Sequence, residues 1–342
     1  MNSLFDLLKT LCELDGPSGN EAPVRDFIMS EIKDFCDAKI DAMGNIIAFK
    51  KGKKSPKFKV MLDAHMDEVG VIVTSITSEG FLKFQTVGGI KAESLFCKRV
   101  RFGNVLGVIG AKPIHQSSPD ERKNLPSADS LYIDIGAANK EEAERYVYLG
   151  DIGTFATHWK ALTDDVFCTK AVDDRVGCAV LINLLKQPAE YDFYATFTVG
   201  EELGLRGAKT ATYTVSPDFA IALECTTAAD IHKNSGNKVA EVEKGVAVSF
   251  MDSATLYDHA LYEFTLQTAQ KNNIPVQVKT AVTGGNNSGA IHLTKSGVRT
   301  ITLSLPGRYI HSSATVGSKN DVIAQNNLVV ALLNELAGGN LS

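Results

Sequence analysis

Residues 58–67, FKVMLDAHMD, combine a short apolar segment with acidic and histidine side chains that follow it directly. The segment Phe58–Leu62 is interrupted by one lysine only, which predicts a buried β-strand that ends at Asp63-Ala64-His65. In open α/β sheets, ligands bind beyond the carboxyl ends of the strands. His65 and Asp67 therefore mark a candidate site, and the ends of the other predicted strands become the places to search.

Helices and strands alternate on both sides of this stretch. Leucines at positions 4, 7, 8 and 11 recur at helical spacing, and Ser18 followed by Glu21 predicts a capping box for a second helix. After residue 160, strand-like apolar segments again alternate with helical patterns, up to a final amphipathic helix at 322–336. This alternation predicts an α/β fold.

The chain between residues 69 and 156 has a different sequence pattern. Its apolar segments are short, β-rich and separated by glycines, as in Val69–Ile76, Leu82–Val87, Lys98–Phe102 and Val105–Ile109. We expect a small β-domain, of barrel type, inserted into an α/β domain. The predicted division is therefore a split α/β domain, residues 1–68 and 157–342, with a β-domain at 69–156 between its halves.

Composition excludes several functional classes. The 342 residues are 44% apolar and 22% charged, as in ordinary globular proteins, and 35 basic against 40 acidic side chains give a formal charge of −5. Such a chain offers no electrostatic footprint for nucleic acid or an anionic membrane. Its six cysteines form no C-x-x-C pair and are expected to be reduced. The sequence contains no apolar run of 18 residues, and its first residues are not expected to form a signal peptide. We expect a cytoplasmic protein.

Four more predicted strands or apolar segments are followed by side chains that can bind metals. These side chains are Asp173 and Asp174 after Ala171-Val172, Glu201 and Glu202 after 193–199, Glu224 after 219–223, and His311 after 298–305. Taken singly, each has an ordinary explanation: Glu224 could be an exposed strand end, and His311 a core histidine. Together, they predict one acidic cluster at the carboxyl edge of the sheet.

Carboxylates at this density would repel one another in a partly buried cleft, and divalent cations would neutralise them. Two histidines with three or more carboxylates match a two-metal hydrolytic site and suit Zn²⁺, Co²⁺ or Mn²⁺. Because neighbouring residues of an extended chain point to opposite sides, one of Glu201 and Glu202 can bind metal while the other faces the attacking water. Asp67 is placed to hydrogen-bond the second ring nitrogen of His65.

In this order the motifs resemble the tetrahedral aminopeptidase family of metallopeptidases, some members of which are labelled endoglucanase or cellulase. The matching stretches are LDAHMDEVG at 62–70, AVDDRVGC at 171–178, EELGLRGA at 201–208 and RYIHS at 308–312. The resemblance covers essentially the whole chain, including the β-insert. It implies a mixed-sheet, zinc-peptidase-like catalytic domain and an inserted β-barrel-like domain that drives self-assembly and covers the active site.

The resemblance also implies an aminopeptidase activity, which releases N-terminal residues from peptides. It implies two divalent metal ions per subunit, Zn²⁺ or Co²⁺ and in some cases Mn²⁺. It further implies a homo-oligomer, typically a dodecamer. The implied roles are Asp173 bridging both metals, His65 and Glu224 on one, Glu202 and His311 on the other, Glu201 as general base and acid, and Asp67 orienting His65.

Two positions depart from the family pattern. Position 224 is Glu where many relatives have Asp, and GGNNSG at 284–289 stands where relatives often have Gly-Gly-Thr-Asp. Asn287 thus replaces an acidic residue, which bears on substrate selectivity. Asn287 and Arg308, which lies just before the His311 motif, are our candidate substrate-binding residues.

Three other functions remain open at this point. A glycoside hydrolase would use two carboxylates that flank the glycosidic bond and needs no metal, so the two histidines argue against it. A metal-dependent deacylase or amidase of acylated amino acids would share the metals but accept N-blocked substrates. A non-catalytic assembly module would not need Glu201.

Overall fold

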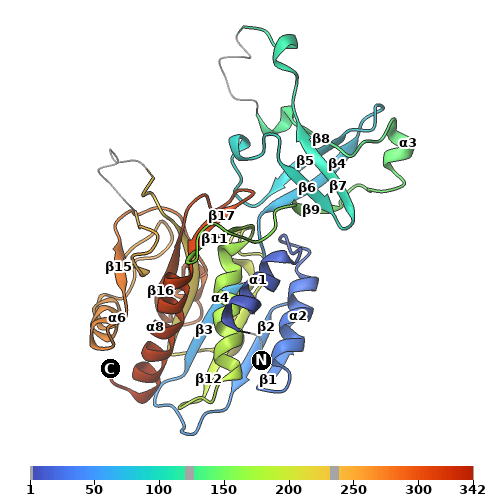
Figure 1. The fold of residues 1–342 in the computed structure, drawn as a ribbon. Coiled ribbons are helices and arrows are strands. Elements are labelled where there is room, and N and C mark those ends of the chain that lie inside the picture. Colours follow the sequence, from blue (N-terminus) through green and yellow to red (C-terminus); the bar gives the residue numbers. More distant parts are fainter. Residues whose placement is uncertain (1–2, 120–126, 232–238, 342) are drawn as a thin grey trace.

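The computed structural model describes residues 3–119, 127–231 and 239–341. Figure 1 shows two parts: a three-layered α/β unit, and a barrel that projects from one end of it. The chain enters the barrel after the strand at residues 60–65 and returns to the α/β unit at about residue 156. The barrel is therefore an insertion, as its pattern of short, β-rich segments predicts.

The α/β unit contains an eight-stranded mixed sheet in the order β1-β2-β12-β3-β13-β16-β14-β15. Its strands are β1 (Asp37–Ile40), β2 (Ile46–Lys50), β3 (Val60–His65), β12 (Phe193–Thr198), β13 (Phe219–Thr227), β14 (Val246–Ser249), β15 (Val276–Lys279) and β16 (Arg299–Gly307). The four central strands, β12, β3, β13 and β16, run parallel. Their carboxyl ends meet at one edge of the sheet, the edge that faces the barrel (Figure 1).

Helices cover both faces of the sheet. One face carries α1 (Leu4–Glu13), α2 (Ala22–Ile32), α4 (Val172–Lys186), α6 (His259–Lys271) and α8 (Lys319–Gly338), and the other carries α5 (Arg206–Val215) and α7 (Ser288–Ile291). Alternation along β3 explains this arrangement: Val60 and Leu62 belong to the larger core, whereas Met61 belongs to the core under α5. No helix in the described ranges combines the length and the apolarity needed to cross a bilayer.

The β-insert is a closed barrel, so the prediction of a small β-domain of barrel type is confirmed. Its strands follow the order β4-β5-β8-β7-β6-β9. They are β4 (Gly70–Ile76), β5 (Leu82–Val87), β6 (Arg99–Phe102), β7 (Val105–Gly110), β8 (Tyr132–Asp134) and β9 (Ile152–Phe155), with the short helix α3 at Lys140–Ala143. A small sheet of β10 (Lys160–Ala161), β11 (Val166–Thr169) and β17 (Thr315–Ser318) lies on the α/β side of the junction.

The predicted capping box at α2 is wrong. The helix begins after Glu21 without a side-chain cap. Ser18 Oγ instead donates to Asp67 Oδ2 at 2.6 Å, and Glu21 Oε1 accepts the backbone N–H groups of Gly19 and Gly200. Buried partners from distant parts of the chain have replaced the local bonds that the spacing predicts.

A buried ion cluster joins the barrel to the α/β unit. Glu68, which precedes the first barrel strand, accepts from Lys170 Nζ at 2.7 and 3.0 Å and from Arg175 Nη2 at 3.2 Å. Thr154 of β9 donates to the same carboxylate at 2.9 Å. Since all three charged side chains are at most 3% exposed, this cluster ties the first and last barrel strands to the start of α4.

Candidate metal centre

The five predicted strand ends meet at the carboxyl edge of the sheet. His65 ends β3, Glu201 and Glu202 follow β12, Asp173 stands at the start of α4, and His311 follows β16. Glu224 lies inside β13 rather than after it, contrary to the prediction, because β13 stays paired with β16 as far as Thr227. The apolar run stops at Leu223, but the backbone ladder continues.

Two groups of ligand-type atoms share Asp173. In the first, His65 Nε2 lies 3.4 Å from Asp173 Oδ1 and 3.7 Å from Glu224 Oε2. In the second, His311 Nε2 lies 3.4 Å from Asp173 Oδ2 and 3.4 Å from Glu202 Oε1. Within each group the candidate atoms all lie within 4.8 Å of one another. Each oxygen of Asp173 therefore faces a different histidine.

These contacts fit cations better than hydrogen bonds. N–H···O bonds usually measure 2.7–3.2 Å, shorter than any of the four distances. Atoms bound tetrahedrally to one zinc ion at about 2.1 Å lie about 3.4 Å apart. In addition, Asp173 Oδ1 is buried and has no hydrogen-bond partner in the described part of the chain. A buried carboxylate oxygen without a donor is a costly arrangement that a cation would relieve.

Backbone carbonyls set the tautomer of both histidines. His65 Nδ1 donates to the carbonyl of Asp67 at 3.1 Å, and His311 Nδ1 donates to the carbonyl of Gly89 at 3.2 Å. Since a carbonyl can only accept, both rings hold a proton on Nδ1 and turn Nε2 toward Asp173. This is the usual support for a metal-binding imidazole. The Gly89 carbonyl comes from the loop after β5, so the barrel contributes to the second group.

The pKa values show that the charged forms of the buried carboxylates are disfavoured without cations. Burial raises the pKa of Glu202 to about 8 and that of Glu201 to about 7, and it raises the pKa of Glu224 well above its ordinary value. Burial alone would lower the pKa of His311, but Asp173 and Glu202 outweigh it and raise that pKa to about 9. Protons would thus have to neutralise charge that divalent cations neutralise more directly.

Asp67 organises the turn that carries both glutamates. Its carboxylate accepts the backbone N–H of Glu201 at 3.0 Å and that of Glu202 at 3.1 Å, besides the hydroxyl of Ser18. Its Oδ1 also lies 3.4 Å from His65 Nδ1. Asp67 thus fixes the positions of one histidine and of two glutamates at once.

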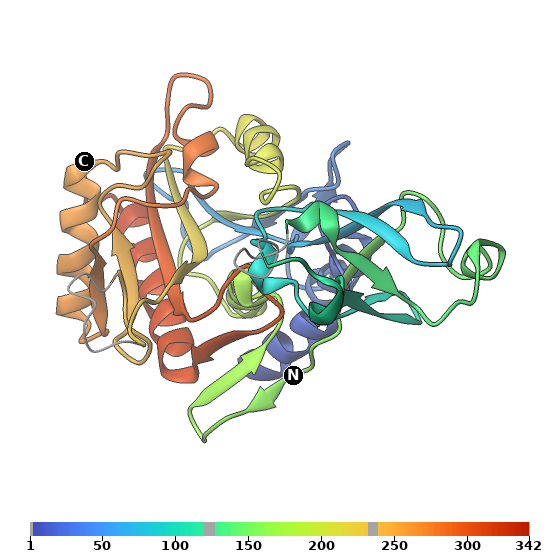
Figure 2. The same cartoon turned by 90° about the horizontal axis from the view of Figure 1, so that it is seen from above.

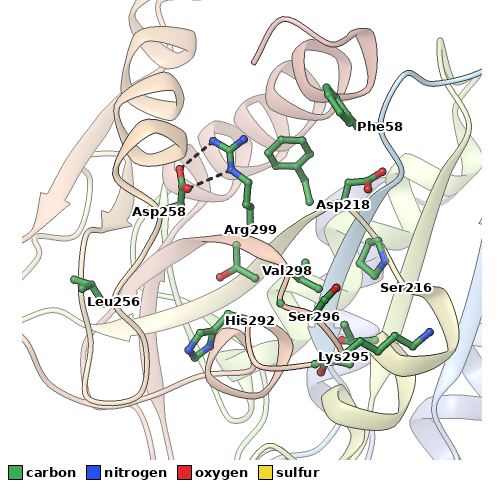
Figure 3. A pocket seen from close by; sticks show the side chains of 16 residues that line it. Phe58, Ser216, Asp218, Leu256, Asp258, His292, Lys295, Ser296, Val298 and Arg299 are labelled. Atoms are coloured by element: carbon green, nitrogen blue, oxygen red, sulfur yellow. Dashed lines mark hydrogen bonds and ion pairs between the residues drawn. The ribbon is translucent and has the colours of Figure 1, made fainter. Parts of the chain in front are cut away.

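The site opens into a cavity of about 470 Å³, which His65, Asp173, Glu201 and Glu224 line on one side. A larger cavity, about 700 Å³, lies at the opposite ends of β13 and β16 (Figure 3). There, Arg299 and Asp258 pair with each other at 3.1 Å, and none of the candidate metal groups of the described residues lines it. Size alone would thus have pointed away from the cluster.

The two candidate substrate-binding residues are engaged elsewhere. Arg308 forms a bidentate pair with Asp230 at 2.6 and 2.7 Å. Asn287 is 1% exposed, and its amide nitrogen donates to Asp63 Oδ2 at 2.7 Å and to Thr198 Oγ1 at 2.8 Å. A substrate contact stays a prediction for both, and these bonds do not favour it. Asn287 instead lies behind Glu224, toward which its backbone N–H points at 3.5 Å.

Sequence reasoning missed three charged residues around the site: Asp63, Glu68 and Lys279. Asp63 lies in an otherwise apolar strand and is fully buried, with Thr196 and Asn287 as donors. Lys279 lines the cavity from the end of β15. Its segment, Val276-Gln277-Val278-Lys279, alternates like a solvent-facing strand, so no local signal placed the lysine inside.

Comparison with known proteins identifies the family of the chain. The sequence model of the M42 glutamyl aminopeptidase family matches residues 44–328. The chain is 35% identical to lysyl aminopeptidase of Pyrococcus furiosus, over 97% of each chain, and 30% identical to glutamyl aminopeptidase of Lactococcus lactis, over 97% of this chain and 96% of that one.

Solved structures are similar over the same length. A TET aminopeptidase from a marine sediment archaeon superposes with a TM-score of 0.93 at 33% identity, over 98% of each chain. PhTET1-12s, a dodecamer in its crystal, superposes with a TM-score of 0.84 at 33% identity, over 97% of this chain and 99% of that one. The chain therefore belongs to the M42 glutamyl aminopeptidase family and is a peptide hydrolase.

Proposed function

We propose that this member of a metal-dependent aminopeptidase family removes N-terminal residues from peptides with two divalent ions, Zn²⁺ or Co²⁺, and with Glu201 as its general base. The observation that carries the proposal is Asp173, whose two oxygens each face a separate His-and-carboxylate group, one of them buried without a donor. His65 and Glu224 would hold one ion, and Glu202 and His311 the other.

The bound ions supply Lewis-acid polarisation of the scissile carbonyl and lower the pKa of water. The protein contributes the proton transfers. Glu201, which lines the cavity and belongs to neither ligand group, accepts a proton from the attacking water at its carboxylate and returns it to the nitrogen of the leaving amine. Without the ions, burial raises the pKa of Glu201 to about 7, and the bound ions would lower it toward the carboxylate form that accepts the proton.

The barrel supports a second part of the proposal. We infer that residues 69–156 form the inserted domain, that this domain drives self-assembly, and that it covers the active site. The loop carrying Gly89 reaches the second ligand group, and the similar PhTET1-12s is a dodecamer. Gel filtration with light scattering tests the self-assembly, and a monomer would contradict it.

A cytoplasmic location remains a prediction, favoured by six free cysteines.

The test of the catalytic part is Glu201→Gln. The amide keeps the size of the side chain but cannot accept the proton, so kcat on aminoacyl p-nitroanilides should fall at least ~100-fold. Metal content, measured by elemental analysis, should stay at two ions per chain. Glu263→Gln, an exposed change on α6, is the matched control. Near-normal turnover of Glu201→Gln would refute its role, and loss of both ions would make it a ligand.

A further inference from the structure

The two histidines of the metal centre lie in different kinds of backbone. His65 is the last residue of β3, a strand that pairs with β12 on one side and β13 on the other, and its side chain is 1% exposed. His311 lies in the loop after β16, and its side chain is 39% exposed. The second ligand group therefore depends on what holds this loop.

The loop around His311 has an unusual backbone. Tyr309 and His311 have φ values of +63° and +56°, in the left-handed region that non-glycine residues rarely adopt. Residues persist in this region only where the surrounding structure holds them there. Tyr309 is 50% exposed, so the packing of its side chain contributes little. The hydrogen bond from His311 to the Gly89 carbonyl is 3.2 Å long and exposed. A stronger anchor is needed.

Arg308 provides that anchor at the base of the loop. Its backbone exchanges two hydrogen bonds of 3.0 Å with Val316, so residues 309–315 form a loop between paired ends. Its guanidinium donates to Asp230 from Nε at 2.7 Å and from Nη2 at 2.6 Å. A guanidinium that binds both oxygens of a carboxylate is fixed in direction as well as in distance. The residue is thus held through its backbone and its side chain.

Asp230 is itself fixed to the α/β unit. It follows β13, the strand that contains Glu224, and its side chain is 7% exposed. Its Oδ2 also accepts the backbone N–H of Val242 at 3.1 Å. The hydrogen bonds from Arg308 lower the pKa of Asp230, which keeps the carboxylate ionised at neutral pH. The pair therefore ties the His311 loop to the strand of the first ligand group.

We propose that Arg308 and Asp230 are positioning residues of the metal centre. Their pair holds the loop in the conformation that presents His311 to the second ion, and so sets the affinity of the second ligand group. This inference rests on the proposed function. His65 needs no such support, because its strand is paired on both sides, so breaking the pair should weaken one ion and spare the other.

The test measures metal affinity. The full-length enzyme, loaded with Co²⁺, is titrated with a chelator of known affinity, and the release of each ion is followed by absorption. In Arg308→Met, which removes the pair but keeps the alkyl stem, one ion should bind at least ~10-fold more weakly, as is typical when support for a metal ligand is lost. The other ion should bind as in the wild type.

Two further variants examine the pair itself. Asp230→Asn should have the same effect as Arg308→Met, and the double variant should lose no more affinity than the weaker of the two, because both changes break one interaction. Arg308→Lys should recover part of the affinity, since lysine keeps the charge but not the bidentate geometry. Losses that add in the double variant would contradict the pairing.

The matched control lies at the other end of the same strand. Arg299, the first residue of β16, forms a bidentate pair with Asp258 at 3.1 and 3.2 Å (Figure 3). Its side chain is 32% exposed, against 29% for Arg308. Arg299→Met should leave the affinity for both ions unchanged. An equal loss of metal affinity in Arg299→Met and Arg308→Met would show a general structural effect and overturn the inference.

Activity separates positioning from direct substrate binding. Because the five proposed ligands remain in Arg308→Met, excess Co²⁺ should restore kcat on aminoacyl p-nitroanilides, with KM unchanged. A raised KM with unchanged metal affinity would make Arg308 a substrate-binding residue and would overturn the inference.

Crystal structures of the two arginine variants give a readout that needs neither turnover nor metal. In Arg308→Met the ring of His311 should be displaced from Asp173, and in Arg299→Met it should stay in place. An undisplaced ring in Arg308→Met overturns the inference. A wild-type enzyme that binds fewer than two ions would instead refute the proposed metal centre, while these structures would still decide the role of Arg308.

Discussion

The buried ion cluster at the domain junction allows a quantitative prediction for Glu68→Gln. Among the described residues, Glu68 is the only carboxylate that pairs with Lys170 and Arg175, and the change removes it. The side chains of Lys170 and Arg175 are 1% and 0% exposed. Breaking a buried pair by removing one partner typically costs about 3–5 kcal/mol, because the remaining charge stays buried. Glutamine can still accept one hydrogen bond, so we expect a loss of about 3 kcal/mol.

Trp159 provides the assay. It is the only tryptophan of the chain, it stacks on Phe167 with ring centroids 4.4 Å apart, and its backbone N–H binds Glu13 near the junction. Urea unfolding followed by its fluorescence gives the free energy of unfolding. Glu144→Gln removes one partner of an exposed pair with Lys140 and serves as the control, with an expected loss below ~0.5 kcal/mol.

A double-mutant cycle separates charge pairing from side-chain packing. Lys170→Met in the Glu68→Gln background removes both charges of the pair, so the double variant should lose at least ~1 kcal/mol less than the sum of the two single losses. A loss below ~1 kcal/mol for Glu68→Gln would refute the reasoning. Strict additivity in the cycle would do the same, since it would show that the pair is not coupled.

Three further predictions concern the site and its surroundings. Removing metal with EDTA should abolish activity and lower Tm. The lost stability should be about 2.7 kcal/mol relative to the enzyme at a free metal concentration 100 times Kd. Adding Zn²⁺ or Co²⁺ should restore both activity and Tm, and activity that EDTA leaves unchanged would exclude a metal enzyme. Gly88→Ala should lower the bound metal from two ions to one, measured by elemental analysis. Gly88 has a φ of +84°, which favours glycine, and an added Cβ would lie 2.9 Å from Val69 Cγ1 and 3.2 Å from Glu202 Cβ. Gly136→Ala, whose added Cβ would meet open space, is the control. Burial raises the pKa of Asp321 to about 6, so its contribution to stability is present below pH ~4 and is lost as the pH rises through 6. In Asp321→Asn, the free energy of unfolding, measured with urea, should fall less over this pH range than in the wild type. Parallel pH dependences of the two proteins would contradict the assignment.

Much of the candidate site could be predicted from the sequence because each residue has a local signal. His65, Glu201 and His311 follow apolar segments, and the carboxyl ends of parallel strands meet at one edge. The strand at 82–87 also has the predicted bounds, because its apolar pattern and the glycines after it agree. These features depend on neighbours in the sequence, and the structure leaves them nearly unchanged.

Other features depend on partners that are distant along the chain. Ser18 and Glu21 have the spacing of a capping box, yet one binds Asp67 and the other binds Gly200. Glu224 lies within its strand because β16 extends the pairing past the last apolar residue. Arg308 and Asn287 stand next to site motifs, but their hydrogen bonds go to Asp230 and Asp63.

The sequence by itself determined the α/β class, the inserted β-domain and the residue types of a metal site, because apolar periodicity and strand-end chemistry are local properties. Only the tertiary structure decided which polar groups are buried together. It placed Lys279 on the cavity wall, although its segment alternates like a solvent-facing strand, and it placed Glu68 between Lys170 and Arg175. Burial is a property of the packed molecule, and the charge it isolates needs a partner that no local pattern identifies.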